Sequence, residues 1–206
     1  MSAYLIGDVR VINRDKYNEY RRALREVIAR HGGRYLARGQ EPEVVQGGWA
    51  PPRMFMVEFK QRADADALIA SDEYARLVEM RANRAMLDMV LVDGVSSARH
   101  AGAGAAPVYA VADTRIVNRP AFEEYKAAIH EAVRSQHGHY LVLSDQVTTV
   151  AGNWAPQLLT VLEFPGRQAA LDAHSASRYQ DLRQLINNTA MIDMVLLSGA
   201  SADVPD

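Results

Sequence analysis

The sequence predicts an α+β fold built from two tandem ferredoxin-like units. Two observations carry this prediction: the chain repeats itself without a gap, and each repeat shows strand and helix periodicities in the order β-α-β-β-α-β. A third observation, a segment of small residues between the repeats, predicts a linker. The expected boundaries are residues 1–95 for the first unit, 96–107 for the Gly/Ala-rich linker and 108–206 for the second unit.

The internal repeat is visible in long stretches of identical or similar residues. Tyr4 to Val95 aligns with Tyr109 to Ala200 at a constant offset of about 105 positions, and roughly a third of the aligned positions are identical. The motif Trp-Ala-Pro, for example, occurs at Trp49 and again at Trp154. An ungapped match of this length indicates an internal duplication.

The first half of each repeat predicts a strand and then an amphipathic helix. Residues 4–12 alternate like a strand, and residues 15–31 carry apolar side chains at helical spacing. Gly32-Gly33 then ends the helix, as glycine commonly does.

The second half of each repeat predicts the remaining elements from period and turn residues. The expected strands are residues 34–38, a short hairpin arm at 43–46, residues 53–60 after the Trp49-Ala50-Pro51-Pro52 turn, and residues 87–92. The expected helices are residues 64–70 and 72–84.

In this arrangement the helices cover one face of an antiparallel sheet, and the other face needs a partner. We expect the second copy to supply it, giving an intrachain dimeric α/β-barrel-like pseudo-dimer in place of a homodimer. A further pairing of two chains stays open.

Composition excludes several classes of function. The formal net charge is -2, from 23 Lys and Arg against 25 Asp and Glu, and there is no basic tract, so we expect no nucleic-acid partner. No charged segment followed by a long apolar run opens the chain, and no apolar run reaches membrane-spanning length, which predicts a cytoplasmic protein without a membrane partner. The absence of cysteine excludes disulfides, thiolate nucleophiles and cysteine-ligated metals.

Several motifs resemble a known superfamily. They are Tyr35-Leu36-Ala37-Arg38-Gly39, Gly47-Gly48-Trp49-Ala50-Pro51-Pro52-Arg53, Glu58-Phe59 and Ser71-x-x-Tyr74. Together they resemble the dimeric α/β-barrel superfamily, in particular its domain-of-unknown-function family 1330. The resemblance implies a site in a cavity beside the sheet. Relatives in the superfamily include cofactor-free monooxygenases, cyclases, dehydratases, isomerases and haem-binding enzymes, so the fold does not choose an activity.

The second copy lacks three arginines of the first. Arg38, Arg53 and Arg81 correspond to Leu143, Leu158 and Ile186. We interpret this as a division of labour, in which the first copy keeps a site for anions. The second copy is then either structural or has a more apolar pocket.

The candidate catalytic residues are Glu58 and Asp8. Strand alternation places Asp8, Arg10 and Glu58 on the sheet face away from the helices, where Glu58 could lie near the other two. A carboxylate in an apolar cavity has a raised pKa, which suits general acid or base catalysis. The alternative is that these charges form ion pairs that fix the sheet, which is a common use of half-buried charge.

The candidate substrate-binding residues are Arg10, Arg38, Trp49, Arg53, Tyr74 and Arg81. The arginines could bind a carboxylate or phenolate, or could be solvated. Trp49 could line a pocket, but its recurrence as Trp154 favours a role in fixing the loop. Tyr74 could donate a proton, although packing is the more common use of such a tyrosine.

Histidines offer weaker candidates. His130, His137 and His139 gather in the second copy, but no carboxylate completes a ligand set, and His174 matches no haem-binding signature. We therefore expect no metal and no cofactor.

The sequence thus favours a small cofactor-independent enzyme of lyase, isomerase or cyclase type. It would act by acid–base catalysis on an anionic or oxygenated small molecule, such as an intermediate of secondary metabolism or aromatic degradation. The alternatives are a non-catalytic small-molecule-binding or accessory protein and, third, a cofactor-free monooxygenase.

Overall fold

The computed structural model describes residues 1–95, 106–176 and 189–200 of the chain. It divides into two compact units. The first unit comprises Met1–Glu41, Pro51–Ser96 and Gln146–Ala155, and the second comprises Pro42–Ala50, Ser97–Asp145 and Pro156–Asp206. Each unit therefore contains a short segment that belongs, by sequence, to the other repeat.

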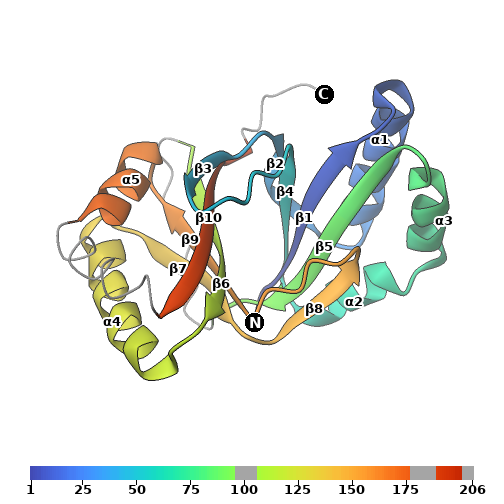
Figure 1. Cartoon of the computed structure of the whole chain (residues 1–206). Coiled ribbons are helices and arrows are strands. Elements are labelled where there is room, and N and C mark those ends of the chain that lie inside the picture. Colours follow the sequence, from blue (N-terminus) through green and yellow to red (C-terminus); the bar gives the residue numbers. More distant parts are fainter. Residues whose placement is uncertain (96–105, 177–188, 201–206) are drawn as a thin grey trace. The chain divides into compact units, whose positions relative to one another are not determined.

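The first unit is an antiparallel sheet with three helices (Figure 1). The strands of the five-stranded sheet have the order β2-β4-β1-β5-β8. Their bounds are β1 Ala3–Val11, β2 Arg34–Gln40, β4 Met54–Phe59, β5 Ala85–Asp93 and β8 Val147–Ala151. The helices are α1 Arg14–Arg30, α2 Arg62–Ile69 and α3 Asp72–Arg81.

The second unit repeats this plan. Its five-stranded sheet has the order β3-β10-β6-β9-β7. The strand bounds are β3 Glu43–Gln46, β6 Val108–Ile116, β7 His139–Ser144, β9 Leu158–Phe164 and β10 Ala190–Ser198. Its helices within the described residues are α4 Arg119–Ser135 and α5 Arg167–Ser175. The predicted α+β class with two ferredoxin-like units is confirmed.

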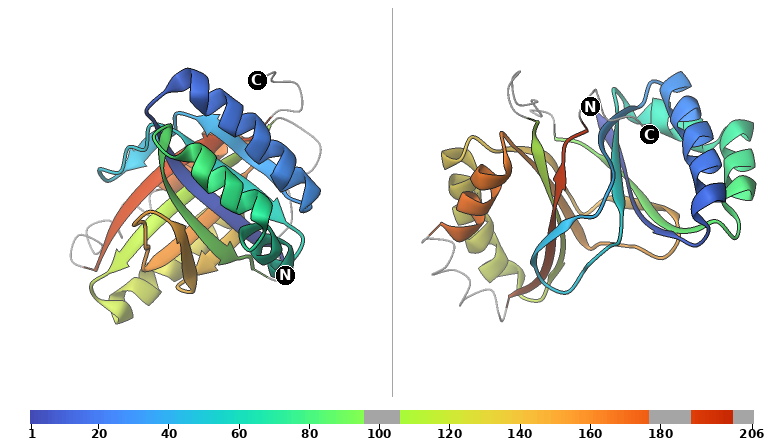
Figure 2. Two further views of the ribbon diagram at one scale, coloured as in Figure 1. Left: turned by 90° about the vertical axis from the view of Figure 1, so that its right-hand side faces the viewer. Right: turned by 90° about the horizontal axis from the view of Figure 1, so that it is seen from above.

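Strand alternation decides which face of the first sheet meets the helices. Leu5 and Val9 of β1 and Phe55, Val57 and Phe59 of β4 lie in one buried cluster with the apolar face of α1. Residues next to them in the sequence point to the opposite face because side chains alternate along a strand. Figure 2 shows α1 and α3 side by side over the helix-covered face.

Helix α1 begins and ends within one residue of the prediction, whereas α2 begins two residues earlier than predicted and α3 ends at Arg81 instead of residue 84. Asn13 caps α1, accepting a hydrogen bond from Lys16 N at 3.1 Å, and Gly32 follows the helix in the left-handed region with a φ of +76°. Among the described residues, no helix is long and apolar enough to cross a membrane.

The arm at residues 43–46 differs from the prediction in its pairing. It does not form a hairpin within its own repeat; β3 pairs antiparallel with β10 of the second unit, with Val44 opposite Val195. The equivalent strand β8 pairs with β5 of the first unit, with Thr149 opposite Val90. The two repeats have therefore exchanged their arms, and each sheet gains its fifth strand from the other repeat.

Candidate functional site

The predicted catalytic carboxylates lie apart on the first sheet. Glu58 is opposite Tyr4 in the β1–β4 register, whereas Asp8 is opposite Met54. Four residues of strand separate the two positions, or about 13 Å. The expectation that Glu58 lies near Asp8 is therefore wrong. Both residues lie, as strand alternation predicts, on the face away from the helices.

Glu58 is held by two partners. Its Oε1 accepts a hydrogen bond from Tyr4 Oη at 3.2 Å, and its Oε2 accepts one from Arg34 Nη2 at 2.8 Å. Tyr4 is fully buried and the Glu58 side chain is 12% exposed. The second unit repeats the pairing in register, with Tyr109 opposite a buried Glu163. This geometry supports the ion-pairing alternative for Glu58.

Trp49 lies in the turn at the tip of the exchanged arm. The backbone N–H groups of Gly48 and Trp49 both donate to Asp193 Oδ1, at 2.6 and 3.0 Å. Gly47 before them has a φ of +80°, and a Cβ there would overlap the Asp193 carboxylate. Asp193 thus fixes the tip of the arm on β10. Arg10 is exposed at the end of β1 and does not join this turn.

The same turn closes the other arm. Gly152 has a φ of +71°, and Asn153 N donates to Asp88 Oδ1 at 2.6 Å. The recurrence of Gly-x-Trp and of Met-x-Asp in both repeats therefore has one explanation. The aspartate of the Met-x-Asp motif in each repeat holds the Gly-x-Trp turn of the other repeat. The sequence shows each motif twice, with Met86-x-Asp88 recurring as Met191-x-Asp193, but does not show that the two motifs meet.

Four tyrosines and several arginines of the first unit gather on the helix-covered side of its sheet. The rings of Tyr17 and Tyr20 on α1 lie 5.9 Å apart, and Arg38 lies 5.6 Å from the ring of Tyr35 on β2. Tyr74 on α3 completes the set of tyrosines. We call Tyr17, Tyr20, Tyr35 and Tyr74, with Arg38, Arg53 and Arg81, the phenol–arginine cluster.

Burial and charge act in opposite directions on these phenols. Desolvation raises the pKa of Tyr20 to about 12, while Arg81 beside it lowers the pKa. Tyr74 has a raised pKa from the same desolvation, again opposed by Arg81. Burial likewise raises the pKa of Tyr17, against the effect of Arg53. At neutral pH the phenols are therefore protonated donors next to guanidinium groups.

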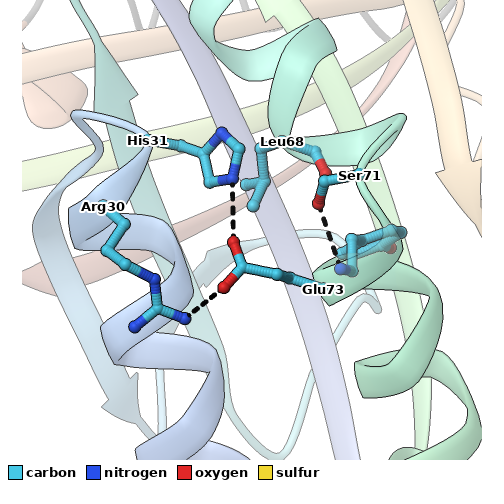
Figure 3. Close-up of polar contacts among 6 residues, drawn as sticks. Arg30, His31, Leu68, Ser71 and Glu73 are labelled. Atoms are coloured by element: carbon cyan, nitrogen blue, oxygen red, sulfur yellow. Dashed lines mark hydrogen bonds and ion pairs between the residues drawn. The ribbon is translucent and has the colours of Figure 1, made fainter.

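Contacts between the end of α1 and the first turn of α3 hold the two helices together (Figure 3). Glu73 in the first turn of α3 accepts hydrogen bonds from Arg30 at 2.6 Å and from His31 at 3.3 Å, both at the end of α1. The Arg30 guanidinium is the main cause of the lowered pKa of Glu73. Ser71 caps α3 by accepting from Tyr74 N at 3.1 Å. These contacts fix the start of α3 and direct Tyr74 toward α1.

Two buried donors in the cluster lack a well-formed hydrogen bond. Tyr74 Oη and Arg81 Nη1 make none with good geometry to a described residue, although the Arg81 side chain lies within reach of the Tyr74 hydroxyl and lowers its pKa through that contact. Tyr74 is 7% exposed. Arg81 lies near both Tyr74 and Tyr20, since it changes the pKa of each. Four of the predicted substrate-binding residues therefore come together here, namely Arg38, Arg53, Tyr74 and Arg81, whereas Arg10 and Trp49 lie elsewhere.

The corresponding place in the second unit is a cavity. It lies between the helix-covered face of the sheet and the helices α4 and α5. Most of its lining is apolar; the polar lining residues are Thr114, Tyr125, Lys126, Tyr140, Thr160 and His174. Leu143, the counterpart of Arg38, also lines it. Residues 177–188, which include Ile186, lie outside the described part of the chain.

The histidines of the second repeat do not form a metal site in the described ranges. No three His, Asp or Glu side chains in residues 1–95, 106–176 and 189–200 lie close enough to hold a metal ion. His130 instead stacks on Tyr140, with ring centroids 5.3 Å apart.

Comparison with known proteins identifies the family. The model of the family named Domain of unknown function (DUF1330) matches the chain twice, over residues 2–95 and 107–200. The chain belongs to this family. The double match confirms the tandem duplication predicted from the sequence. Comparison with curated protein sequences gives no match.

Solved structures with the same fold extend over the whole DUF1330 tandem chain. A protein from Fusobacterium nucleatum, proposed to be a monooxygenase, superposes with a TM-score of 0.56 at 13% identity over 97% of this chain and 93% of its own. A protein proposed to be a chlorite dismutase gives 0.55 at 9% identity over 98% and 95%. One from Lactobacillus acidophilus, also proposed to be a monooxygenase, gives 0.51 at 12% identity over 98% and 99%. At such low identity the likeness shows the fold alone.

Proposed function

We propose that the first unit binds a small organic anion and acts on it as a cofactor-independent lyase, isomerase or cyclase. The observation that carries this proposal is the pair of buried donors, Tyr74 Oη and Arg81 Nη1. Leaving such groups without an acceptor costs about 1–3 kcal/mol each. A ligand carboxylate, enolate or phenolate that accepts from both would remove this cost.

The chemistry follows from the charge state of the cluster. Because desolvation raises the pKa of Tyr20 and Tyr74, both phenols keep their protons at neutral pH. They can donate hydrogen bonds, and then a proton, to an oxygen that gains negative charge during the reaction. Arg81 would hold that charge, and Arg38 and Arg53 would widen the positive field around it. In this proposal Glu58 and Asp8 do not contact the substrate.

The second candidate is a binding protein that releases its ligand unchanged. One observation favours it: every charged side chain that acts on the pKa of the four clustered phenols is an arginine. A cluster of donors suits capture of an anion, whereas removal of a proton needs a base. The two candidates share a binding site and differ in whether the ligand is transformed.

The first test compares two arginines of the same helix. Arg81→Ile introduces the residue that the second repeat carries at this position, and Arg76→Ile removes an exposed arginine of α3 as the matched control. With benzoate and a panel of small carboxylates as ligands, we expect Arg81→Ile to raise Kd about tenfold or more, the loss of one charge-assisted contact. Equal affinities for the two variants, measured by calorimetry, would refute the proposal.

Tyr74→Phe separates a ligand-binding role from a structural one. Since the hydroxyl makes no well-formed hydrogen bond within the described residues, its removal should change the free energy of unfolding by less than about 1 kcal/mol. Binding of the carboxylate should weaken. A variant that loses stability and keeps its affinity would assign Tyr74 to the fold. Incubation of any bound ligand with the wild-type protein, followed by NMR, then distinguishes turnover from simple binding.

A further inference from the structure

We propose that the cavity of the second unit is a separate ligand site for a small neutral molecule that carries a ring and one hydroxyl or carbonyl group. The cavity occupies the place that, in the first unit, is filled by core side chains. The comparison of the two repeats shows which substitutions open it.

Three large core residues of the first repeat are replaced by small ones. Leu5, Phe55 and Leu68 are all buried in the first core, and their counterparts are Ala110, Thr160 and Ala173. All three small counterparts line the cavity. The replacements remove roughly ten non-hydrogen side-chain atoms, which is about the size of a small ring compound.

A compensating change shows that the space is adapted rather than accidental. Gly7 and Phe55 lie opposite each other in the first sheet, and a Cβ on Gly7 would lie within 2.5 Å of the Phe55 ring at Cζ. The same cross-strand pair in the second sheet is Ala112 and Thr160. A methyl group is present there because no aromatic ring covers it.

The polar residues of the cavity indicate the chemistry of the ligand. Val9 and Ile69 of the first repeat correspond to Thr114 and His174, and both replacements introduce a hydrogen-bonding group into the lining. Arg38, by contrast, corresponds to Leu143, which also lines the cavity. The lining cation Lys126 forms an ion pair with Glu123 at 2.5 Å, so its charge is already compensated. Gaining hydroxyl and imidazole groups while losing a guanidinium therefore favours an uncharged ligand with an oxygen function.

The test fills the cavity with residues that the chain already uses. Ala112→Gly with Thr160→Phe recreates the Gly7–Phe55 pair, and Ala173→Leu recreates Leu68 independently, so one of them should fold even if the other does not. Phenol, acetophenone and benzyl alcohol serve as neutral probes. We expect them to raise the Tm of the wild-type protein by about 5 °C at a hundredfold excess over Kd.

Each filled variant should unfold at or above the wild-type temperature without probe and should lose at least tenfold in affinity for all three probes. Probe binding that persists in both filled variants, or no binding to the wild-type protein, would overturn the proposal. Arg81→Ile is the control in the first unit and should leave probe binding unchanged, so failure here is distinguishable from failure of the anion site. An absorption band of bound haem in the purified protein would also overturn it.

Discussion

Replacing Asp193 by alanine should release the tip of the exchanged arm from the second unit. Asp193 Oδ1 is the acceptor for two backbone N–H groups, Gly48 N at 2.6 Å and Trp49 N at 3.0 Å. The remaining length of the arm pairs with β10 along Glu43–Gln46, and Arg167 holds Glu43 through hydrogen bonds to both carboxylate oxygens. The substitution therefore frees one end of the arm and leaves the other held.

The magnitude follows from the two lost hydrogen bonds. A hydrogen bond to a charged acceptor contributes about 1.5–3 kcal/mol, and partial exposure of this turn places each bond at the lower end. We expect the free energy of opening the arm to be about 2–4 kcal/mol lower in Asp193→Ala than in the wild-type protein. Since about 1.4 kcal/mol corresponds to a factor of ten, amide protection in β3 should fall roughly thirty- to a thousandfold.

Native-state hydrogen exchange measures this directly at the amides of residues 43–46. Asp193→Asn is the matched control, since its side-chain oxygen can still accept both hydrogen bonds while the charge is lost. Asp193→Asn should lower the free energy of opening the arm by less than half as much as Asp193→Ala does. Amide protection in β6 and β9, the central part of the same sheet, should change little in either variant.

Two results would refute the reasoning. The first is unchanged protection of residues 43–46 in Asp193→Ala, which would mean that the turn is held by something other than the carboxylate. The second is an equal loss of protection throughout the second unit, which would mean that Asp193 supports the whole sheet and not the arm.

Two further predictions concern the core and the phenols. Gly7→Ala should lower the free energy of unfolding by about 1–3 kcal/mol because its Cβ would overlap Phe55. Adding Phe55→Thr should recover part of that loss. If urea denaturation shows that the losses from the two substitutions simply add, the overlap is not the cause. Burial raises the pKa of Tyr20 and Tyr140 to about 12 from 10.0, so the folded state keeps protons that the unfolded state releases. The stability from these phenols should be complete below pH 10 and lost as the pH rises through 12. Tyrosinate absorbance of the folded protein at pH 10 that disappears in Tyr20→Phe or Tyr140→Phe would contradict this.

The sequence was sufficient to predict the elements and their faces. Period-2 alternation placed Phe55, Val57 and Phe59 against the helices, and helical spacing placed Tyr17 and Tyr20 on the buried face of α1, as the structure has them. These predictions hold because burial of a complete face constrains every second or every third to fourth residue.

The arm exchange could not be predicted in the same way. A strand of four residues such as β3 is too short for its sequence pattern to indicate which strand it pairs with. Pairing within its own repeat or with the other repeat would satisfy the same backbone hydrogen bonds. The signal lay instead in two motifs far apart in the sequence, the glycine turn at Gly47 and the aspartate at Asp193. Only the fold brings them together.

The sites show a similar limit. The loss of Arg38 and Arg53 from the second repeat predicted the asymmetry, but not that the cluster lies on the helix-covered face. The cavity could have been suspected by aligning the repeats and comparing side-chain sizes, since the replacement of Phe55 by Thr160 is visible in the sequence. Whether neighbours refill such a space depends on packing, which sequence alone does not give.

We infer that the two units have diverged into an anion site and a neutral-ligand site. An NMR titration of one isotopically labelled sample, first with benzoate and then with phenol, tests it most directly. We predict that benzoate shifts the amides around Tyr20, Tyr74 and Arg81, and that phenol shifts those around Ala112 and Thr160. If both ligands shift the same amides, or if benzoate shifts only those of the second unit, the account is contradicted.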